Sequence, residues 1–574
     1  MGVLSEKVTP LEAKLTHADD RIRLNDWLPP QWGVVPQIRL GKRWFSVLWL
    51  LPLAFLFLLI GVAVVQELRQ IPAIQAFLER YPGHTISPVE WHGFPLWMRC
   101  MHFFNLFLMF LIIRAGIQIL ADHPRLYWNV DCTPGTEWFR FQRPVPTGRI
   151  WTAKDDSVTI PGWLGIPGLR HSIGLARWWH FSCDFLWVIN GAAFYVMLFA
   201  SGQWGKLVPR TWAVFPNSLS VAIQYLSIQF PPNESWIRFN SLQQLAYFTT
   251  VFIAAPLAIV TGLMQGPAIA NRLGWFGRVF HRQVARSIHF LVMLYFVFFI
   301  FVHVTMVFVT GLRGNVNKMF AGVNGNGSAG FAIFIPAMAI VVITWAIATP
   351  LTINHTRLVQ RTGRFIIGWL KGLVEWFDPK RQYTQTDISP YFWPNGTMPN
   401  SEEYRVLARD NFAGYSLRIG GLVANPLVFS LAELKAMPRQ EQITEHFCIQ
   451  GWSGVAKWGG VPMRHILNLV RPTPDARYAV FYSLADGSDG GKYYDVHRLE
   501  NMAHHLTILA YEMNGEPVTV LHGAPLRLRC ENELGFKQVK WIEAIEFVAD
   551  FAQLGAGQGG YNEDHEFYGY RMPI

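Results

Sequence analysis

The chain has 574 residues, 51% of which are apolar, and a formal net charge of +10 at neutral pH. This length and composition suggest more than one domain with a large membrane-embedded part. The five cysteines form no CxxC pair and lack the spacing of a disulfide framework, so they are expected to be separate thiols.

Six apolar runs are long enough to cross the ~30 Å hydrocarbon core of a membrane. From residue 352 onward no such run occurs, and short β-type segments such as YSLRIGGLVA and PVTVLH alternate with turn residues. The sequence therefore predicts an N-terminal tail over 1–43, a membrane α-helical bundle over 44–351, a linker over 352–384 and a soluble mixed α+β domain over 385–574. The six expected transmembrane helices lie at about 45–66, 100–121, 180–201, 243–264, 287–310 and 331–351.

Lysine and arginine are distributed unevenly over the segments between these runs. With the N-terminus inside, the inner segments hold 22 of them and the outer segments hold 7. Cytoplasmic loops carry such an excess, so we expect a multi-pass protein of a bacterial inner membrane whose tail and soluble domain are cytoplasmic. This bias, together with contacts to anionic cofactors, accounts for the net positive charge, so no nucleic-acid partner is expected.

The stretch ARSIHFLVMLYFVFFIFVHVTMVF carries His289 and His303 within an apolar run long enough to span a membrane. An imidazole in hydrocarbon is costly unless something satisfies it. Fourteen helical residues at ~100° each return to within ~40° of the same face, and at ~1.5 Å per residue they separate the two rings by ~21 Å. His102, near the outer end of the second run, and His180, at the inner start of the third, supply one more imidazole at each depth.

Bis-imidazole ligation of haem iron is the chemistry that uses such pairs. Pairing by depth predicts an inner site with His180 and His289 and an outer site with His102 and His303. The alternative is that membrane histidines cap polar defects or lie at the interface by chance, but four that pair by depth favour haem. Arg114, deep in LIIRAGIQIL, is either a partner for a haem propionate or a snorkelling side chain near a helix end.

Four segments within about 97–310 carry a more specific pattern: RCMHFFNLFLMFLIIRAGIQI, RWWHFSCDFLWVINGAAFYVMLF, FNSLQQLAYFTTVFIAAPLAIVTGLM and RSIHFLVMLYFVFFIFVHVTMVF. They resemble successive helices of the di-haem cytochrome b561-type family, the membrane subunits that accompany formate dehydrogenases, nickel–iron hydrogenases and thiosulfate reductases. The run at 45–66 precedes that family's core, so the first core helix is expected to enter from the outside. The resemblance implies electron exchange with a quinone pool and two b-type haems held by His102, His180, His289 and His303.

In the soluble part, TEHFCIQGWSGVAKWGGVPMRHIL places a lone cysteine, Cys448, after an expected strand and before a turn-rich stretch. Taken alone, Cys448 is typical of a buried core thiol. Its thiolate is also a soft ligand for a transition metal where nearby positive charge lowers its pKa. The residues around it decide between these alternatives.

Four stretches extend the pattern around this cysteine: SPYFWPNG, SLRIGGLVANPLVFSLAELKAMP, HFCIQGWSGVAKWGGVPM and HGAPLRLRCENELGFKQVKWIEAIEF. Over about 385–552 they resemble the oxidoreductase molybdopterin-binding domain of the sulfite oxidase superfamily, and more closely the catalytic subunit of the bacterial methionine sulfoxide reductase. The resemblance implies that Cys448 binds molybdenum and is the catalytic residue. Cationic donors such as arginine and lysine suit the phosphate of a pterin. The resemblance further implies that the molybdopterin is held by Asn395, Ser483, His522, Arg527, Gln538, Val539 and Lys540.

Two departures from that family concern the substrate side of the site. His522 stands where the methionine sulfoxide reductase has an asparagine. The inserted segment GSDGGKYYDVHRLENMAHH (487–505) differs in sequence from that family. We expect this segment to be a loop that borders the substrate entrance. Its basic residues either bind an oxyanion substrate or belong to a solvated loop; they are His497, Arg498, His504 and His505.

Together the two halves predict an electron path between a membrane pool and a substrate. A molybdenum centre carries out two-electron chemistry, haems pass one electron at a time and a quinone carries two. We expect a membrane-bound molybdenum oxidoreductase that reduces an S- or N-oxide with electrons from quinol through two b-type haems. The alternatives are quinone-linked oxidation of a small anion such as sulfite, and a non-catalytic transmembrane electron carrier. Membrane lipid, the quinone pool and a small-molecule substrate are the expected partners, and the sequence leaves a homo-oligomer open.

Overall fold

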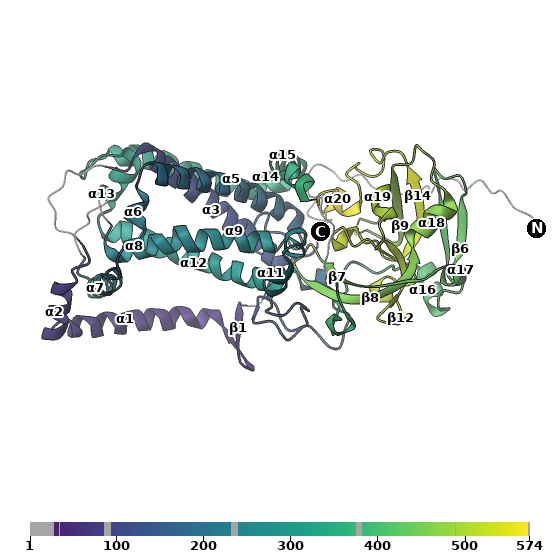
Figure 1. The fold of residues 1–574 in the computed structure, drawn as a ribbon, viewed down its shortest axis with the longest axis horizontal. Helices are drawn as coiled ribbons and strands as arrows, with labels where there is room; N and C mark the ends of the chain where they lie inside the picture. The colour runs from purple at the N-terminus through teal and green to yellow at the C-terminus, as the bar shows by residue number, and fades with distance from the viewer. Residues whose placement is uncertain are drawn as a thin grey trace, which may run out of the picture.

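The computed structural model describes residues 28–33, 35–84, 93–230, 239–374, 382–487 and 489–571. Figure 1 shows a bundle of long helices at one end of the molecule and a sheet-rich domain at the other. Most of the expected N-terminal tail lies outside the described residues, and its described end forms β1 (Gln37–Leu40) and the start of β2 (Arg43–Ser46).

Six helices are long and apolar enough to cross a membrane, so the predicted six-helix bundle is confirmed within the described residues. Two of them, α5 and α12, begin before their apolar runs and project toward the soluble domain. The six are η1 (Val47–Trp49) with α1 (Leu50–Leu68), α3 (Leu96–Asp122), α5 (Ile173–Ala200), α8 (Ser241–Phe248) with η2 (Thr249–Ala254) and α9 (Ala255–Met264), α12 (Arg282–Val309), and α14 (Ala329–Asn354).

The first of these helices, α1, lies along the edge of the bundle (Figure 1). None of its residues is buried, and Leu51 and Phe57 are 68% and 69% exposed. Its ends are fixed, because β1 pairs with β4 (Phe139–Arg140) and Arg69 donates to Ser227 Oγ at 2.6 Å. The long apolar surface between these two anchors is suited to lipid.

Short helices cover both ends of the bundle. Those at the end far from the soluble domain are α2 (Pro72–Arg80), α6 (Trp204–Leu207), α7 (Val214–Leu226), α13 (Leu312–Val316) and η3 (Asn317–Ala321) (Figure 1). Between α9 and α12 the chain forms α10 (Pro267–Ala270) and α11 (Gly274–Val279).

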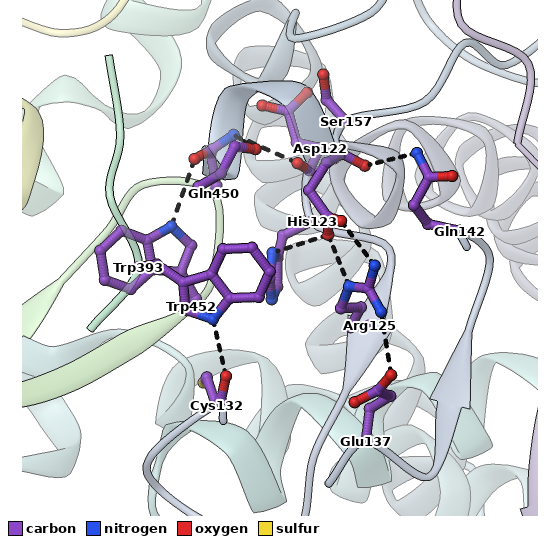
Figure 2. A network of polar contacts seen from close by, with 12 residues as sticks. Asp122, His123, Arg125, Cys132, Glu137, Gln142, Ser157, Trp393, Gln450 and Trp452 are labelled. Carbon is purple, nitrogen blue, oxygen red and sulfur yellow. Dashed lines mark hydrogen bonds and ion pairs between the residues drawn. The ribbon is translucent and has the colours of Figure 1, made fainter. Parts of the chain in front are cut away.

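The segment between α3 and α5, residues 123–172, folds into a hydrogen-bonded unit that we call the inner connection. Its strands β3 (Arg125–Leu126) and β4 join β1 and β2 in a four-stranded sheet, and α4 (Ala153–Asp156) follows. Arg125 is fully buried and donates to Asp156 at 2.8 and 2.9 Å and to Glu137 at 3.0 Å (Figure 2). Removing one partner of a buried ion pair costs ~3–5 kcal/mol, so this network holds the inner connection in one shape.

The segment predicted as a linker is largely helical. α14 continues into it, and α15 (Thr356–Val374) follows directly. Val359 and Ile367, on one face of α15, are buried with Trp178 of α5. The apolar residues of α15 recur at helical spacing instead of forming one continuous run, which is why a search for membrane-length runs misses this helix.

The soluble domain is a mixed α+β fold, as predicted, built on two five-stranded sheets. The first has the order β10-β9-β14-β5-β6, in which β14 runs parallel to β5 and the other pairs are antiparallel. The second is antiparallel, in the order β12-β11-β8-β7, with β13 also paired to β11. Buried side chains from both sheets, such as Val461 and Phe481, belong to one core.

The elements of this domain have the following bounds. The strands are β5 (Ser416–Gly421), β6 (Leu427–Ser430), β7 (Gln440–Phe447), β8 (Ser453–Pro462), β9 (Tyr478–Asp486), β10 (Lys492–Arg498), β11 (Ile508–Met513), β12 (Glu516–Pro517), β13 (Arg527–Arg529) and β14 (Ile542–Val548). The helices are η4 (Gln385–Asp387), α16 (Glu402–Arg409), α17 (Leu431–Ala436), α18 (Met463–Val470), α19 (Leu499–Ala503), η5 (Val520–His522), η6 (Gly535–Lys537) and α20 (Tyr561–His565).

Two segments of the soluble domain dock on the membrane bundle. The turn between β7 and β8 lies against the start of α12, where Gln283 donates to Gly451 O at 2.9 Å. The segment around α20 lies against α5 and α15, where Trp178 donates to Phe567 O at 2.8 Å. Because membrane-domain side chains pair with backbone carbonyls in both places, the two domains meet in a defined orientation.

Gly174, near the start of α5, tests this docking. A Cβ at Gly174 would lie 2.3 Å from Glu566 O and 2.5 Å from the ring of Tyr568, so Gly174→Ala must push the C-terminal segment away. We expect this strain to lower the free energy of unfolding by ~1–3 kcal/mol. The measurement is the thermal unfolding midpoint of the purified protein.

Gly191→Ala, in the middle of the same helix, is the matched control. Apart from its chain neighbours and the backbone of its own helix, no described atom lies within 4 Å of the added methyl group. Replacing glycine in a helix interior contributes roughly 0.5–1 kcal/mol in favour of alanine, so this variant should be neutral or more stable. Equal destabilisation by both substitutions would contradict the close approach at Gly174.

Candidate functional site

A cavity with about 980 Å³ of empty space, part of it open to solvent, lies where the soluble domain meets the inner connection. Cys448 and Lys540 line it from the soluble domain, and Lys154 and His171 line it from the inner connection. Both domains therefore build the wall of this cavity.

Cys448 is the first residue after β7, in a tight turn that leads into β8. Its N–H donates to Trp452 O at 3.0 Å, and Gly451 N donates to Cys448 O at 3.1 Å. Gly451 has a φ of +108°, a conformation that favours glycine. This turn, residues 448–452, fixes the direction of the cysteine side chain, and we call it the cysteine turn.

The sulfur of Cys448 has polar neighbours from two segments. Asn395 Nδ2 lies 3.7 Å from Sγ, and Sγ lies 3.6 Å from Gln450 Oε1. Burial raises the pKa of the Cys448 thiol to about 12, so the protein alone keeps this thiol protonated. A metal ion deprotonates a thiol that coordinates it, so the surroundings of Cys448 fit a ligand that becomes a thiolate only when the metal is bound.

Two buried basic side chains line the same cavity. Arg527 Nη1 donates to His522 O at 2.7 Å, and Arg527 Nε is buried with no hydrogen-bond partner among the described residues. Lys540 Nζ donates to the carbonyl oxygens of Asn395 and Leu521. Burial and the neighbouring Arg527 lower the pKa of Lys540 well below its ordinary value. A phosphate would supply the missing acceptor and relieve this repulsion, so these residues fit the anionic end of a pterin.

The remaining residues predicted to hold the pterin fall into two groups. Asn395, His522 and Gln538 line the cavity, whereas Ser483 and Val539 do not. Ser483 Oγ donates to Lys540 O at 2.8 Å, and Val539 is buried in the core of the soluble domain. These two residues therefore support the backbone that carries Lys540 instead of facing the cavity.

The expectation of a loop over 487–505 is wrong, because β10 and α19 occupy most of this segment. His497 is 1% exposed, and its Nε2 lies 2.7 Å from Lys537 O. Charged residues suggest a solvated loop, but here Asp495 pairs with the buried Lys537 inside the domain. None of the four residues expected to bind an oxyanion, His497, Arg498, His504 and His505, lines the cavity.

Gln450, which was not predicted, joins the cysteine turn to the membrane domain. Its Oε1 accepts a hydrogen bond from Trp452 Nε1 at 3.4 Å. Its amide nitrogen lies 3.3 Å from Asp122 O (Figure 2), and it also lies 3.1 Å from Ala153 O and 3.2 Å from His171 Nδ1. Gln450 and His171 are 279 positions apart in the chain, so no local sequence pattern could reveal this contact.

His446 is a second unpredicted residue of the cavity. It precedes Cys448 by two positions and lies next to the last residue of β7, and a chain that continues in extended conformation places residues two apart on the same side. This residue could therefore have been found from the sequence. Lys154 and His171 could not, because in the sequence they are indistinguishable from the other basic residues of the inner connection.

The four membrane histidines meet in the two predicted pairs. The ring centres of His102 and His303 lie 6.3 Å apart, and those of His180 and His289 also lie 6.3 Å apart. Metal–imidazole bonds of ~2 Å on each side, together with the radius of each ring, place two ring centres about 6 Å apart across a shared ion. Both pairs therefore have the spacing of a bis-imidazole iron site.

Neighbouring groups orient the two rings of the His180–His289 pair. His180 Nδ1 lies 3.0 Å from Ile112 O, and His289 Nδ1 lies 3.1 Å from Thr261 Oγ1. A histidine whose Nδ1 is held in this way presents Nε2 as the ligand atom. A Cβ at Gly116 would lie 3.2 Å from the ring of His180, so this glycine leaves room for that ring.

Arg114 fits neither of the two roles expected from the sequence. It is 1% exposed, which excludes a snorkelling side chain. Its guanidinium donates to Thr349 Oγ1 at 2.6 Å and to the carbonyl oxygens of Gly162, Gly165 and Trp345. Because these groups occupy its donors, Arg114 holds the inner connection against α14 and does not offer them to a haem propionate.

Comparisons with known proteins agree with this two-part architecture. The family model of the prokaryotic cytochrome b561 matches residues 93–322, and that of the oxidoreductase molybdopterin binding domain matches residues 405–553. The chain is 32% identical over 212 residues to the putative protein-methionine-sulfoxide reductase subunit YedZ1 of Azospira oryzae, which covers 36% of this chain and 72% of that protein.

A second relative is the protein-methionine-sulfoxide reductase catalytic subunit MsrP of Xanthomonas axonopodis pv. citri. It is 36% identical over 174 residues, which are 28% of this chain and 54% of that protein, so the chain spans about half the length of this subunit. Among solved structures, the sulfane dehydrogenase SoxCD from Paracoccus pantotrophus shares 25% identity over 24% of this chain and 39% of that chain, with a TM-score of 0.22. This TM-score is too low to carry a structural argument.

The helical bundle with its paired histidines and the sheet domain with its buried cysteine coincide with the two matched regions. The extent of the match to YedZ1 establishes the family of the chain. The chain is therefore an oxidoreductase that belongs to the YedZ1 family and joins a cytochrome b561 membrane domain to a molybdopterin-binding domain in one polypeptide.

Proposed function

We propose that this enzyme passes electrons from the quinone pool to a small S- or N-oxide through two b-type haems and a molybdenum–molybdopterin centre. The observation that carries the proposal is the position of the cysteine turn against the start of α12, the helix that holds His289 and His303. One helix thereby connects the substrate cavity with both histidine pairs.

The distances along α12 are short. Arg282 donates to Trp452 O at 3.3 Å, within the cysteine turn. His289 lies seven residues further along the helix, ~10 Å at 1.5 Å per residue, and His303 lies a further ~21 Å away. An inner haem between His180 and His289 would thus be the electron partner of the cavity, and an outer haem between His102 and His303 would face the quinone.

Each cavity residue then has a chemical role. Cys448 ligates molybdenum, which when bound supplies two-electron oxygen-atom transfer. Arg527 and Lys540 hold the pterin phosphate, and Asn395 donates to the sulfur of Cys448. His522 and Gln538 supply further polar contacts from the cavity wall.

The substrate class is supported by the relatives and by the site. Both relatives, YedZ1 and MsrP, are named for the reduction of methionine sulfoxide, an S-oxide. Lys154 and His171 of the membrane domain line the cavity of Cys448 together with the soluble domain, and we take this two-sided wall to favour a small oxide.

We place the soluble domain on the cytoplasmic side of a bacterial inner membrane. The support is the distribution of lysine and arginine, with 22 on the side of the soluble domain and 7 on the other. An alkaline phosphatase fused after Ile574 should be inactive in intact cells, because this reporter folds only after export, whereas a fusion in the α13–α14 connection should be active. An active C-terminal fusion would reverse the assignment.

His303→Ala tests the assignment of two haems. Because His303 pairs with His102 and His289 with His180, the variant should lose about half of the b-type absorbance and keep the inner haem. The measurement is the reduced-minus-oxidised spectrum per mole of purified protein.

The control for this variant is His355→Ala, which alters an exposed histidine beyond the end of α14 and should leave the spectrum unchanged. Loss of both haems or of neither in a folded His303→Ala protein would show that the pairing is wrong.

Cys448→Ser tests the molybdenum site. The exchange keeps the side-chain volume nearly constant, so folding should be little disturbed. The metal would lose its soft protein ligand, while Arg527 and Lys540 still anchor the pterin phosphate. We expect both haems and much of the pterin to remain, and oxide-driven reoxidation of the haems to fall at least 100-fold.

Cys530→Ser is the control, because Cys530 is buried in the core of the soluble domain and does not line the cavity. It should keep its activity. Full turnover in Cys448→Ser would contradict the role of Cys448 as the molybdenum ligand on which activity depends.

A further inference from the structure

Four ionisable side chains form a continuous row across the boundary between the domains. Lys154 Nζ lies 3.1 Å from Glu566 Oε1, Glu566 Oε2 lies 3.3 Å from His171 Nε2, and His171 Nδ1 lies 3.2 Å from Asp122 Oδ2. The side-chain exposure falls along this row from 19% at Lys154 through 12% and 7% to 0% at Asp122. The row therefore leads from the solvent into the protein.

This row belongs to the cavity of Cys448. Lys154, His171 and Glu566 all line the cavity, and His171 contacts Gln450, two residues beyond Cys448. The residues come from α4, the inner connection, the segment after α20 and the end of α3, so the row exists only when the domains are docked.

The backbone of His171 is also unusual. Its φ of +56° lies in the left-handed region, which a residue other than glycine rarely adopts. Such conformations cost ~1–3 kcal/mol and persist only where the surrounding contacts impose them. The ion pairs with Asp122 and Glu566 supply those contacts, and the imposed backbone turns the ring so that each nitrogen faces one carboxylate.

The reaction proposed above needs protons at this place. Reduction of an S-oxide consumes two electrons and two protons for each sulfoxide and yields one sulfide and one water. The S–O bond breaks, sulfur is reduced, and two O–H bonds form on the released oxygen. The electrons come from quinol through the haems, and the protons come from the solvent by way of groups that line the cavity.

We propose that Lys154, Glu566 and His171 form a proton path into the molybdenum cavity, with Asp122 as the residue that orients His171. This inference rests on the proposed oxide reduction. Asp122 pairs with Nδ1 of His171, and Lys154 and His171 hold the pKa of Glu566 well below its usual range, so Glu566 stays ionised while His171 is charged. The proton at Nε2 of His171 passes to Glu566 only as the cavity takes a proton up, and the His171–Glu566 pair is then reprotonated from the solvent side next to Lys154.

The charge state of His171 is consistent with this role. Burial alone would lower the pKa of His171, but the carboxylates of Glu566 and Asp122 raise it to about 9. The imidazole is therefore protonated at neutral pH and loses its proton as the pH rises through about 9. The ionisable groups that face this cluster are Asp122, Lys154, Arg170, Glu566 and Tyr568.

The first test uses the purified holoenzyme and His171→Gln, with haem reoxidation by a panel of sulfoxides and N-oxides. The variant should turn over at least tenfold more slowly at pH 7, with a larger solvent deuterium isotope effect and a KM within twofold of the wild type. It should also lose the fall in rate that the wild type shows above about pH 9. Reduction of its haems by quinol should be unchanged.

Gln360→Ala separates this role from simple docking. Gln360 donates to Tyr568 O at 2.9 Å across the same boundary but does not line the cavity. Its pH profile and isotope effect should match the wild type. An unchanged isotope effect and pH profile in His171→Gln, or the same changes in Gln360→Ala, would overturn the proton path.

The second test does not depend on a substrate. In a redox titration followed by electron paramagnetic resonance, the molybdenum potential of the wild type should fall as the pH rises, with a change of slope near pH 9. His171→Gln should lose this change of slope, while both haem potentials stay unchanged. A wild type that reduces no oxide would overturn the proposed function alone, and an unaltered slope in His171→Gln would overturn the proton path alone.

Discussion

The contact of the cysteine turn with the start of α12 and the end of α3 fixes the orientation of the two domains, and the candidate site depends on it. Gln450 reaches from this turn to the end of α3, and Arg282 and Gln283 reach back from α12 to its carbonyl oxygens. Each such hydrogen bond contributes only ~0.5–1.5 kcal/mol net, but a buried partner left without one costs ~1–3 kcal/mol. The contact is therefore strongly selective for one orientation of the domains.

The inner connection is polar and lies next to the membrane helices, and its internal contacts hold the two domains in this orientation. Its buried charges are paired, as in Arg125 with Asp156 and Glu137, and Arg114 fastens the connection to α14 through carbonyl oxygens. The inner connection, held in this way, presents Lys154 and His171 to the cavity at fixed positions. In the proposed electron path, joining both domains in one chain also keeps donor and acceptor together, so transfer does not require a second protein to diffuse and dock.

Sequence reasoning succeeds where a repeat or a motif carries the signal. Apolar runs of membrane length predict all six long helices, and the fourteen-residue spacing of His289 and His303 predicts two ring pairs at different depths. It fails where contacts between distant segments determine the local structure. The apolar residues of α15 are spaced along one helix face and form no continuous run. Asp495 pairs with a buried lysine in a segment whose charge suggests a loop, and Arg114 donates to carbonyl oxygens that no local pattern reveals.

The central claim is that electrons pass within one molecule between the inner haem and the Cys448 cavity. Stopped-flow absorbance of the reduced holoenzyme, mixed with a small oxide at several protein concentrations, tests it most directly. The account predicts that the oxide reoxidises the haems with a rate constant independent of protein concentration, because donor and acceptor share one chain. A rate proportional to protein concentration, or haems that stay reduced while the molybdenum centre is reoxidised, would contradict it.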